Sequence, residues 1–533
     1  MAAELQLVKS DATGEVTFAA AGEVKDRLSS ELIFALVGPV ASGVSTVASI
    51  LRRKLGADYK YDVPEVIKVS DFIKQLAGKV SPTISESTLA DRITSYQEVG
   101  TALRGALGGA VLAKLAIKRI SEIRHADGYR KVQTDQGEAS VPVSKRRIYI
   151  IDSLKNPEEI IQLREIYGNI FWLIGVSAAD YVRSSRLKIL GVEESRIFSI
   201  LNRDMGEKAE FGQKVRKAFS SADFFIRNDS ENTDQLERSV DRFLEVVFGV
   251  GLNGPTSEES AMFHAATAAS KSACLSRQVG ASLMSDDGGL ISVGWNDVPR
   301  YGGGLNPDDQ GAVEEARCFH WRGKVCHNDA EKSLISNRIV DGIKDALNKK
   351  AIEAVKKNKK CVPVILESKE ILAAIESSGV SSLIEFSRAI HAEMACILSV
   401  ARDKRHNLKG ATMVVTTYPC HNCARHIVAS GVVKVVYLEP YEKSLAIKLH
   451  PDAISEDVRE VDKVHFIQFQ GFAPRHILDL FSVKQDRKEN GALIVRSKSD
   501  ALPVYRRHLD SFTLYEDKIV YDIDEIVKPR VIV

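Results

Sequence analysis

Residues 32–56 read LIFALVGPVASGVSTVASILRRKLG, and they decide the fold class of the first half of the chain. The run Leu32–Val37 is apolar, has the length of a strand and ends at Gly38. After a glycine-rich turn, apolar residues return at helical spacing between Val47 and Leu55. A strand, a turn and a helix in this order predict the beginning of a parallel α/β sheet.

Two more strands of the same sheet are predicted downstream. Ile148–Ile151 ends on Asp152, and Ile170–Val176 follows a helical pattern over residues 158–167. Because strands alternate with helices, we expect a parallel sheet with helices on both faces. Residues 126–145 are rich in Gly, Gln, Asp and Lys, and we expect a surface loop there.

The turn after the first strand, Gly38–Thr46 (GPVASGVST), has the G-x4-G-x-[ST] spacing of a phosphate-binding loop. In such a loop backbone N–H groups hold phosphates, and a hydroxyl group contributes to binding of Mg²⁺. Val44 stands where the motif has a lysine, so we expect nucleotide binding without phosphoryl transfer. The alternative is that the glycines only form a tight turn. The predicted nucleotide-binding residues are Gly38, Gly43, Ser45, Thr46 and Asp152.

The composition is that of a globular protein with more than one domain: 533 residues, of which 44% are hydrophobic and 27% charged. The 73 Lys and Arg residues nearly balance the 71 Asp and Glu residues, so we expect no stable binding of nucleic acid. No apolar run approaches the roughly 18 residues of a membrane span, and the N-terminus does not resemble a secretory signal. We therefore expect a cytoplasmic protein that does not bind membranes.

The cysteines divide the chain into two chemically different halves. All seven cysteines and eleven of the twelve histidines follow residue 263. An odd number of cysteines without a secretory signal indicates free thiols and metal ligands rather than disulfides. Residues 249–260 (GVGLNGPTSEES) interrupt the hydrophobic periodicity, and we place a domain boundary there.

The second half is also predicted to be α/β. Residues 262–272 have a helical pattern, 280–285 and 290–294 form a predicted hairpin, and 411–416 and 433–438 are predicted buried strands. A long insertion separates the hairpin from the later strands. Its segment 348–360 contains six lysines, which we interpret as a solvated helical face rather than a nucleic-acid contact.

Two short motifs in this half predict a zinc site, His391-Ala392-Glu393 and Pro419-Cys420-His421-Asn422-Cys423. A catalytic zinc takes three protein ligands and leaves one position open, and His391, Cys420 and Cys423 supply three. The two cysteines share one face if a helix follows Pro419. His391 and Glu393 can reach one site only where a helix begins.

Glu393 is then a catalytic proton shuttle and not a ligand. It passes a proton from the activated water to a ring nitrogen and another to the departing ammonia, which is the hydrolytic deamination of a cytosine or adenine ring. The alternatives are a closed zinc knuckle and a buried core histidine, and no second C-x-x-C is present to complete a knuckle. We expect His421 and His426 to be bystanders.

These motifs resemble those of the zinc-dependent cytidine and deoxycytidylate deaminases. Residues 274–281 (CLSRQVGA) and 294–299 (GWNDVP) resemble deoxycytidylate deaminases in particular. The resemblance implies that Asn296 meets the sugar hydroxyl and that Tyr441 lies near the nucleotide. It also suggests a second, structural zinc, for which free thiols are the alternative. Its candidate ligands are Cys274, Cys318, His320, Cys326 and His327.

The first half resembles nucleotide and dephospho-coenzyme A kinases at residues 177–183 and 222–228. The whole chain resembles the bacterial anti-phage dCTP deaminases. This implies an N-terminal P-loop nucleotide-kinase-like parallel sheet and a C-terminal cytidine deaminase-like α/β/α domain. It also implies a homo-oligomer that deaminates dCTP and dCMP and depletes dCTP, with a regulatory nucleotide at the P-loop. The predicted parts are a tail (1–28), a P-loop domain (29–250), a deaminase domain (251–485, insertion about 306–387) and a C-terminal extension (486–533).

Other functions stay open at this point. One is a dCMP deaminase of pyrimidine metabolism, and another is a polynucleotide cytidine deaminase, against which the near-neutral charge argues. A third is a bifunctional nucleotide kinase or a regulator without catalysis that binds a structural zinc.

Overall fold

The chain forms two compact units in a computed structural model, residues 1–254 with 470–533 and residues 255–469. The structure describes residues 27–527 except 127, 135–136, 206–213, 231, 307–315, 357–367, 378–379, 381–382, 384–385, 404–405, 442–443 and 485. Nearly all of the predicted tail, 1–28, therefore lies outside the described residues.

The first unit contains a six-stranded sheet in the order β14-β7-β6-β1-β5-β2. Strand β1 lies at its centre, parallel to β5 and β6, and all six of its residues are buried. The predicted parallel α/β sheet is thus confirmed. The strands are β1 (Leu32–Val37), β2 (Val66–Lys68), β5 (Ile148–Leu154), β6 (Phe171–Ser177), β7 (Phe224–Arg227) and β14 (Gly471–Phe472).

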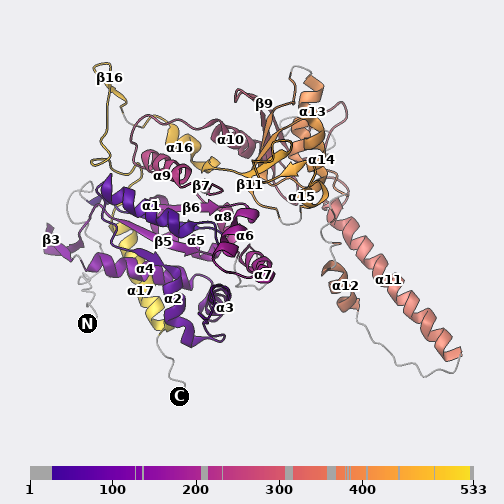
Figure 1. Ribbon diagram of the computed structural model, residues 1–533, viewed down its shortest axis with the longest axis horizontal. Coiled ribbons are helices and arrows are strands. Elements are labelled where there is room, and N and C mark those ends of the chain that lie inside the picture. The colour runs from indigo at the N-terminus through magenta and orange to yellow at the C-terminus, as the bar shows by residue number, and fades with distance from the viewer. Residues whose placement is uncertain are drawn as a thin grey trace, which may run out of the picture. The chain divides into compact units, whose positions relative to one another are not determined.

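Helices cover both faces of this sheet, with α1 and α9 on one face and α4, backed by α17, on the other (Figure 1). Helix α1 begins directly after the loop that follows β1, as predicted. The helices are α1 (Val44–Ala57), α2 (Val69–Leu76), α3 (Leu89–Leu107), α4 (Val111–His125), α5 (Pro157–Tyr167), α6 (Asp180–Ile189), α7 (Glu194–Met205), α8 (Val215–Ser220), α9 (Asp234–Val247), α16 (Ile477–Phe481) and α17 (Asp510–Val527).

A hairpin replaces the loop that was expected over residues 126–145. Strands β3 (Tyr129–Thr134) and β4 (Gly137–Pro142) pair antiparallel. The expectation was wrong because composition alone masks the aromatic and β-branched residues of the segment, such as Tyr129 and Val132, which favour extended backbone.

After the second unit the chain returns to the first at Gln470, earlier than the predicted boundary at residue 485. Strand β14 pairs with β7, and the Phe472 ring lies 4.6 Å from that of Phe224 between ring centroids. Helix α17 packs against α4. The predicted C-terminal extension is therefore part of the first unit.

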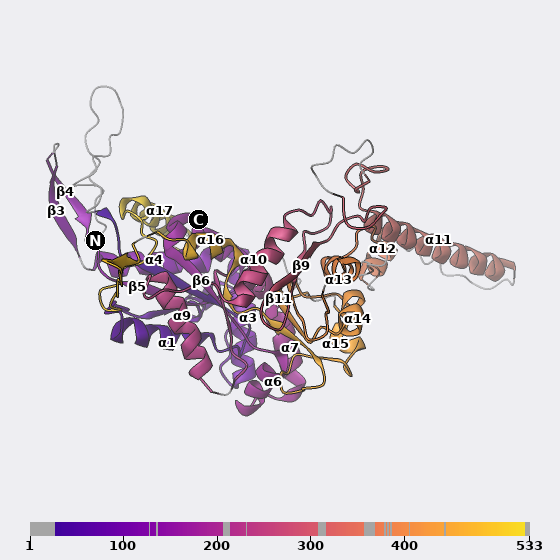
Figure 2. The same cartoon turned by 90° about the horizontal axis from the view of Figure 1, so that it is seen from above.

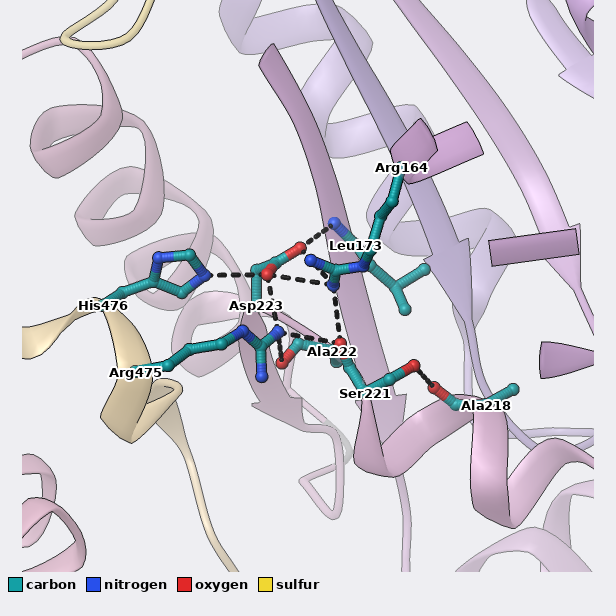
Figure 3. Close-up of polar contacts among 8 residues, drawn as sticks. All are labelled: Arg164, Leu173, Ala218, Ser221, Ala222, Asp223, Arg475 and His476. Atoms are coloured by element: carbon teal, nitrogen blue, oxygen red, sulfur yellow. Dashed lines mark hydrogen bonds and ion pairs between the residues drawn. The ribbon is translucent and has the colours of Figure 1, made fainter. Parts of the chain in front are cut away.

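Asp223 anchors this returning segment, as Figure 3 shows. Its carboxylate is 1% exposed and accepts hydrogen bonds from Leu173 N (2.7 Å), Arg475 (2.6 Å) and His476 (2.7 Å). Burial raises the pKa of Asp223, but the His476 hydrogen bond and the charges of Arg475 and Arg164 prevail and lower it to about 2. The carboxylate therefore stays ionised and ties residues 475–476 to β6 and β7.

The second unit contains a mixed six-stranded sheet in the order β12-β13-β11-β10-β8-β9. The predicted hairpin is β8 with β9, and the predicted buried strands are β10 and β11, which pair in parallel. The strands are β8 (Gly280–Met284), β9 (Leu290–Trp295), β10 (Thr412–Thr417), β11 (Lys434–Glu439), β12 (Ile454–Ser455) and β13 (Val464–Gln468); the helices are α10 (Ser257–Ala269), α13 (Ala392–Asp403), α14 (His421–Ser430) and α15 (Ala446–Leu449).

The insertion contains two further helices, α11 (His327–Lys356) and α12 (Ser368–Ser377). They pack together through Val340, Ile371 and Ile375. Residues 348–350 of the predicted segment 348–360 are exposed, in agreement with a solvated face, whereas the side chains of residues 351–360, and with them four of the six lysines, lie outside the described part. Figure 2 shows α11 extending from the strands and helices of this unit.

Within the described ranges, no single helix has the length and hydropathy of a membrane span. Among the described helices, one pair, α3 and α4, reaches that length and composition together, with a bend of 87° between them.

Candidate active site

The zinc motifs lie at the first turns of two helices of the second unit. The carbonyl of His391 accepts the N–H of Ala395, so His391 precedes α13 directly and Glu393 is in its first turn. Cys420 is the N-cap of α14, and its sulfur accepts the Cys423 N–H at 3.5 Å. The predicted placement of both motifs at helix ends is therefore found.

Close packing of α13 on β9 sets the position of the His391 and Glu393 side chains. A Cβ at Gly294 of β9 would lie 2.6 Å from the carbonyl oxygen of Ala392 and 2.7 Å from the nitrogen of Cys396. Only glycine allows this approach, because real Cβ contacts are longer than this. Gly294 therefore determines how near α13 comes to the sheet.

Three ligating side chains meet between the two helices. The Nδ1 atom of His391 lies 3.2 Å from the Cys420 sulfur and 3.3 Å from the Cys423 sulfur. All three ligating atoms lie within 4.8 Å of one another, and both cysteines are buried. One imidazole and two thiols are a donor set that fits Zn²⁺ and leaves a fourth position for a reactant. The site is a Zn²⁺ site, as predicted.

The charges of these groups are tightly coupled. The hydrogen bond from the Cys423 thiol, helped by His391, lowers the pKa of Cys420 to about 4. The hydrogen bond to Cys420 raises the pKa of His391 to about 9. Because Zn²⁺ takes cysteines as thiolates and histidine as the neutral imidazole, binding of the metal releases protons from this cluster.

Glu393 is 3% exposed and lies in the wall of a cavity that His391 and Cys420 also line. Burial raises the pKa of Glu393 because a carboxylate is poorly solvated there. A buried carboxyl group with a raised pKa holds a proton more readily than a solvated one, which suits it to donate a proton as well as to accept one in general acid–base catalysis.

Asn296 and Tyr441 line the same cavity, so the predicted substrate-binding residues and the zinc ligands are brought together. Asn296 also has a structural role: its Nδ2 donates to the carbonyl of Arg277 at 2.8 Å, and its Oδ1 accepts the N–H of Val279 at 2.7 Å. It therefore fixes the segment that precedes β8. The Tyr441 side chain is half-buried, and burial raises its pKa.

The predicted phosphate loop of the first unit has the backbone of an anion-binding nest. Ala41 and Gly43 have positive φ angles of 63° and 92°. At its φ of 92° any other residue than glycine would be strained at position 43, and a Cβ there would also displace the Asn228 side chain, whose Nδ2 would lie 2.2 Å away. Ser45 Oγ donates to Asp152 Oδ2 at 2.7 Å, which places the predicted Mg²⁺-binding hydroxyl and carboxylate side by side. Thr46 is exposed next to Ser45.

Comparison with known proteins places the zinc site in a family. Residues 255–439 match the cytidine and deoxycytidylate deaminase zinc-binding region. The deoxycytidylate deaminase of Enterobacteria phage T2 is 32% identical over 174 residues, which are 33% of this chain and 75% of the phage protein. The chain belongs to the deoxycytidylate deaminase family. It is a zinc-dependent nucleotide deaminase, and therefore a hydrolase.

Other known proteins match the chain at lower sequence identity. A UPF0200/UPF0201 protein of Archaeoglobus fulgidus is 23% identical to the deaminase over 223 residues, which are 42% of this chain and 56% of the archaeal protein. Among solved structures, the dCMP deaminase of cyanophage S-TIM5 in complex with dCMP and dUMP is 16% identical, with a TM-score of 0.22 and coverage of 41% of this chain and 99% of the other. The shikimate kinase of Bacteroides thetaiotaomicron is 15% identical, with a TM-score of 0.23 and coverage of 40% and 97%.

The second zinc site of the deaminase finds no support among the described residues. The predicted ligands are Cys274, Cys318, His320, Cys326 and His327, and no three of their ligating atoms lie within 4.8 Å of one another. Instead Cys274 lines the active-site cavity, the Cys326 sulfur lies 3.2 Å from Ser276 Oγ, and the ring of His327 packs against Trp321.

Arg277 is a cavity residue of the deaminase that sequence reasoning missed. It pairs with Glu439 at 2.9 Å, and its guanidinium lies 5.8 Å from the centre of the Tyr441 ring. It is the only cation in the stretch 274–281, which was singled out for its resemblance and not for its charge. The sequence signal that could have identified Arg277 is that it is a single basic residue in a stretch that resembles a nucleotide-binding segment.

Proposed function

We propose that the second unit deaminates dCTP as well as dCMP and thereby lowers the cellular dCTP pool. One observation carries the catalytic part: the buried carboxyl group of Glu393 shares a cavity wall with His391 and Cys420 of the zinc site. Asn296 and Tyr441 in the same wall support a nucleotide rather than a free base as substrate.

The reaction replaces the exocyclic amino group of cytosine with oxygen from water and releases ammonia. When bound, Zn²⁺ supplies the Lewis-acid chemistry that lets water attack at neutral pH. Glu393 accepts a proton from the attacking water and donates it to the ring nitrogen, and a second proton leaves with the amino group. Its raised pKa suits both transfers.

Arg277 is the residue we assign to the substrate phosphates. Its side chain is 47% exposed at the cavity, and it is held by Glu439 and by the Tyr441 ring. A guanidinium in this position offers several donors to phosphate oxygens. Because phosphate chains of different length start from the same sugar, this contact is compatible with dCMP and dCTP.

The first unit, in this proposal, binds a regulatory nucleotide with Mg²⁺ at residues 38–46. The positive φ angles of Ala41 and Gly43 and the Ser45–Asp152 hydrogen bond support binding. Val44 in place of the lysine argues against phosphoryl transfer. In this chain, as in the anti-phage dCTP deaminases that it resembles, a P-loop unit precedes a deaminase unit. This shared order supports a role in defence. We propose that the protein acts in the cytoplasm as a homo-oligomer.

The test follows dCTP, dCMP and CTP separately by chromatography with the purified full chain and Glu393→Ala as control. We expect uracil nucleotides from dCTP and dCMP, and none from the variant, which should retain its zinc. Product from dCMP alone would overturn the dCTP proposal and indicate a deaminase of pyrimidine metabolism. No product from any free nucleotide, with zinc present, would direct the search to polynucleotide substrates.

The defence role has its own test. Cells that express the wild type should lose dCTP after phage infection and yield fewer plaques than cells that express Glu393→Ala. Equal plaque numbers in both strains would contradict the anti-phage proposal, even if the purified enzyme deaminates dCTP.

A further inference from the structure

Lys155 brings a positive charge to the phosphate loop from outside the motif. It follows β5 directly, and its ammonium group donates to the carbonyl oxygen of Gly38, the first residue of the loop, at 2.7 Å. Its side chain is 18% exposed, whereas Val44, where the motif has its lysine, is apolar and buried. A cation is therefore present beside the loop, directly after the neighbouring strand β5.

The same ammonium group binds a carboxylate that also accepts a backbone N–H of the loop. Asp204, at the end of α7, is fully buried, and its Oδ2 accepts the backbone N–H of Val40 at 2.6 Å. Its Oδ1 lies 3.1 Å from the Lys155 nitrogen. A backbone N–H of the loop and a lysine ammonium are the two kinds of donor that a P-loop offers to phosphate.

Arg186 adds a further charge at the rim of the loop. Its guanidinium donates to the carbonyl oxygens of Ala41 (3.1 Å) and Asn228 (2.9 Å). No carboxylate in the described part of the chain forms an ion pair with Arg186, although the negative charge of Asp229 raises the pKa of Arg186 against the effect of burial. Burial lowers the pKa of Arg186, so an additional anion nearby would stabilise its charged form.

We propose that Lys155 is the phosphate-binding cation that this P-loop lacks at residue 44, and that Asp204 holds the place of a phosphate until a nucleoside polyphosphate with Mg²⁺ displaces it. The proposal rests on the P-loop nucleotide of the proposed function and specifies how that nucleotide is bound. Ser45 and Asp152 stand 2.7 Å apart for the Mg²⁺. Occupancy of the site then depends on competition between an internal carboxylate and the incoming phosphates.

The test measures binding of magnesium tripolyphosphate by calorimetry. This probe carries the phosphate chain without a base, since the base is unidentified. All chains are full length and carry Glu393→Ala, with saturating dCMP to fill the deaminase cavity. We expect Lys155→Gln to weaken binding at least tenfold and Asp204→Asn to tighten it several-fold, because the variant loses the competing negative charge.

Two variants separate this role from a structural one. Lys60→Gln removes the same charge from an exposed lysine that also donates to a carbonyl, that of Ala57 at 2.7 Å, and should bind the probe like the parent. Val44→Lys, added to Lys155→Gln, returns a lysine to its usual place in the motif and should restore binding.

The outcomes distinguish the two proposals. No binding of tripolyphosphate to the parent chain overturns the P-loop nucleotide and this proposal together. Binding that Lys155→Gln leaves unchanged overturns this proposal alone. Equal weakening by Lys155→Gln and Asp204→Asn, with lowered melting temperatures, shows that the pair is only a structural ion pair.

Discussion

At the scale of single residues, the zinc cluster and Glu393 were predictable because their chemistry is local. His391 and Glu393 are two residues apart and Cys420 and Cys423 three apart, so the first turn of a helix determines how the two side chains of each motif lie. The two motifs then meet because α13 and α14 lie side by side. Contacts between distant residues could not be predicted in this way. Lys155 and Gly38 are 117 positions apart, and nothing in the spacing of the phosphate-loop motif indicates that Lys155 contacts it.

Replacement of Glu393 by glutamine should separate catalysis from metal binding. The amide cannot transfer protons, so we expect deamination to fall by about 10²–10⁴-fold, while the zinc content measured by mass spectrometry stays the same. Glu258→Gln is a matched control, because Glu258 lies in the same unit and forms a partly exposed ion pair with Lys434 at 2.9 Å. Loss of zinc from Glu393→Gln would contradict the assignment as a proton shuttle.

At the scale of elements, the strands and helices next to the motifs were predicted from periodicity, whereas short and polar ones were missed. Strand β14 has two residues, which is too few to form a pattern. It exists because Phe472 packs on Phe224 and because Asp223 binds the segment that follows. Tertiary contacts of this kind override local propensity.

Gly294→Ala should displace α13 and impair the zinc site, although it replaces none of the zinc ligands. The added Cβ would collide with the backbone of Ala392 and Cys396, so α13 must shift outward with His391 and Glu393. We expect lower zinc affinity and lower activity together, measured by chelator competition and product formation. Gly342→Ala on α11, where a Cβ meets nothing within 4 Å, should leave both unchanged. Normal zinc affinity in Gly294→Ala would refute the argument.

The contact between α4 and α17 should give the first unit a pH-dependent stability. Arg124 of α4 binds both Glu31 and Glu516, and burial, only partly offset by Arg124, raises the pKa of Glu516 from 4.5 to about 7. Between these values the folded chain binds a proton that the unfolded chain has lost, so stability falls as pH rises.

Hydrogen exchange of the α4 and α17 amides from pH 5 to 8 measures this effect. The stability of Glu516→Gln relative to the wild type should rise over that range by about 1–3 kcal/mol, because the amide does not titrate. Lys518→Gln is the control, since Lys518 is exposed on the same helix. Parallel pH profiles for wild type and Glu516→Gln would contradict the prediction.

At the scale of the whole molecule, two units of different chemistry were predictable from the distribution of cysteine and histidine, and the position of the first boundary near residue 254 agrees with the structure. The return of the chain to the first unit was not. The residues that carry it, such as Arg475 and His476, are polar and have no periodicity, and their partner Asp223 lies about 250 positions earlier.

Asp223→Asn should weaken the first unit and spare the second. The amide leaves Arg164, Arg475 and His476 without their common counter-ion, and we expect a loss of about 2 kcal/mol, since the arginines are partly exposed. Protease digestion should then release residues after 470 more readily, while zinc content and deamination persist. Equal resistance of both chains to digestion would show that Asp223 does not hold the segment.

The return of the chain at Gln470 also has a consequence for biosynthesis. A ribosome that has finished the deaminase unit has not yet made β14 and α17, so the first unit cannot complete its sheet until the residues after 469 have been synthesised. The deaminase unit is available to fold first, although it comes second in the sequence. A chain that terminated before Gln470 would therefore carry a complete deaminase unit beside an unfinished first unit.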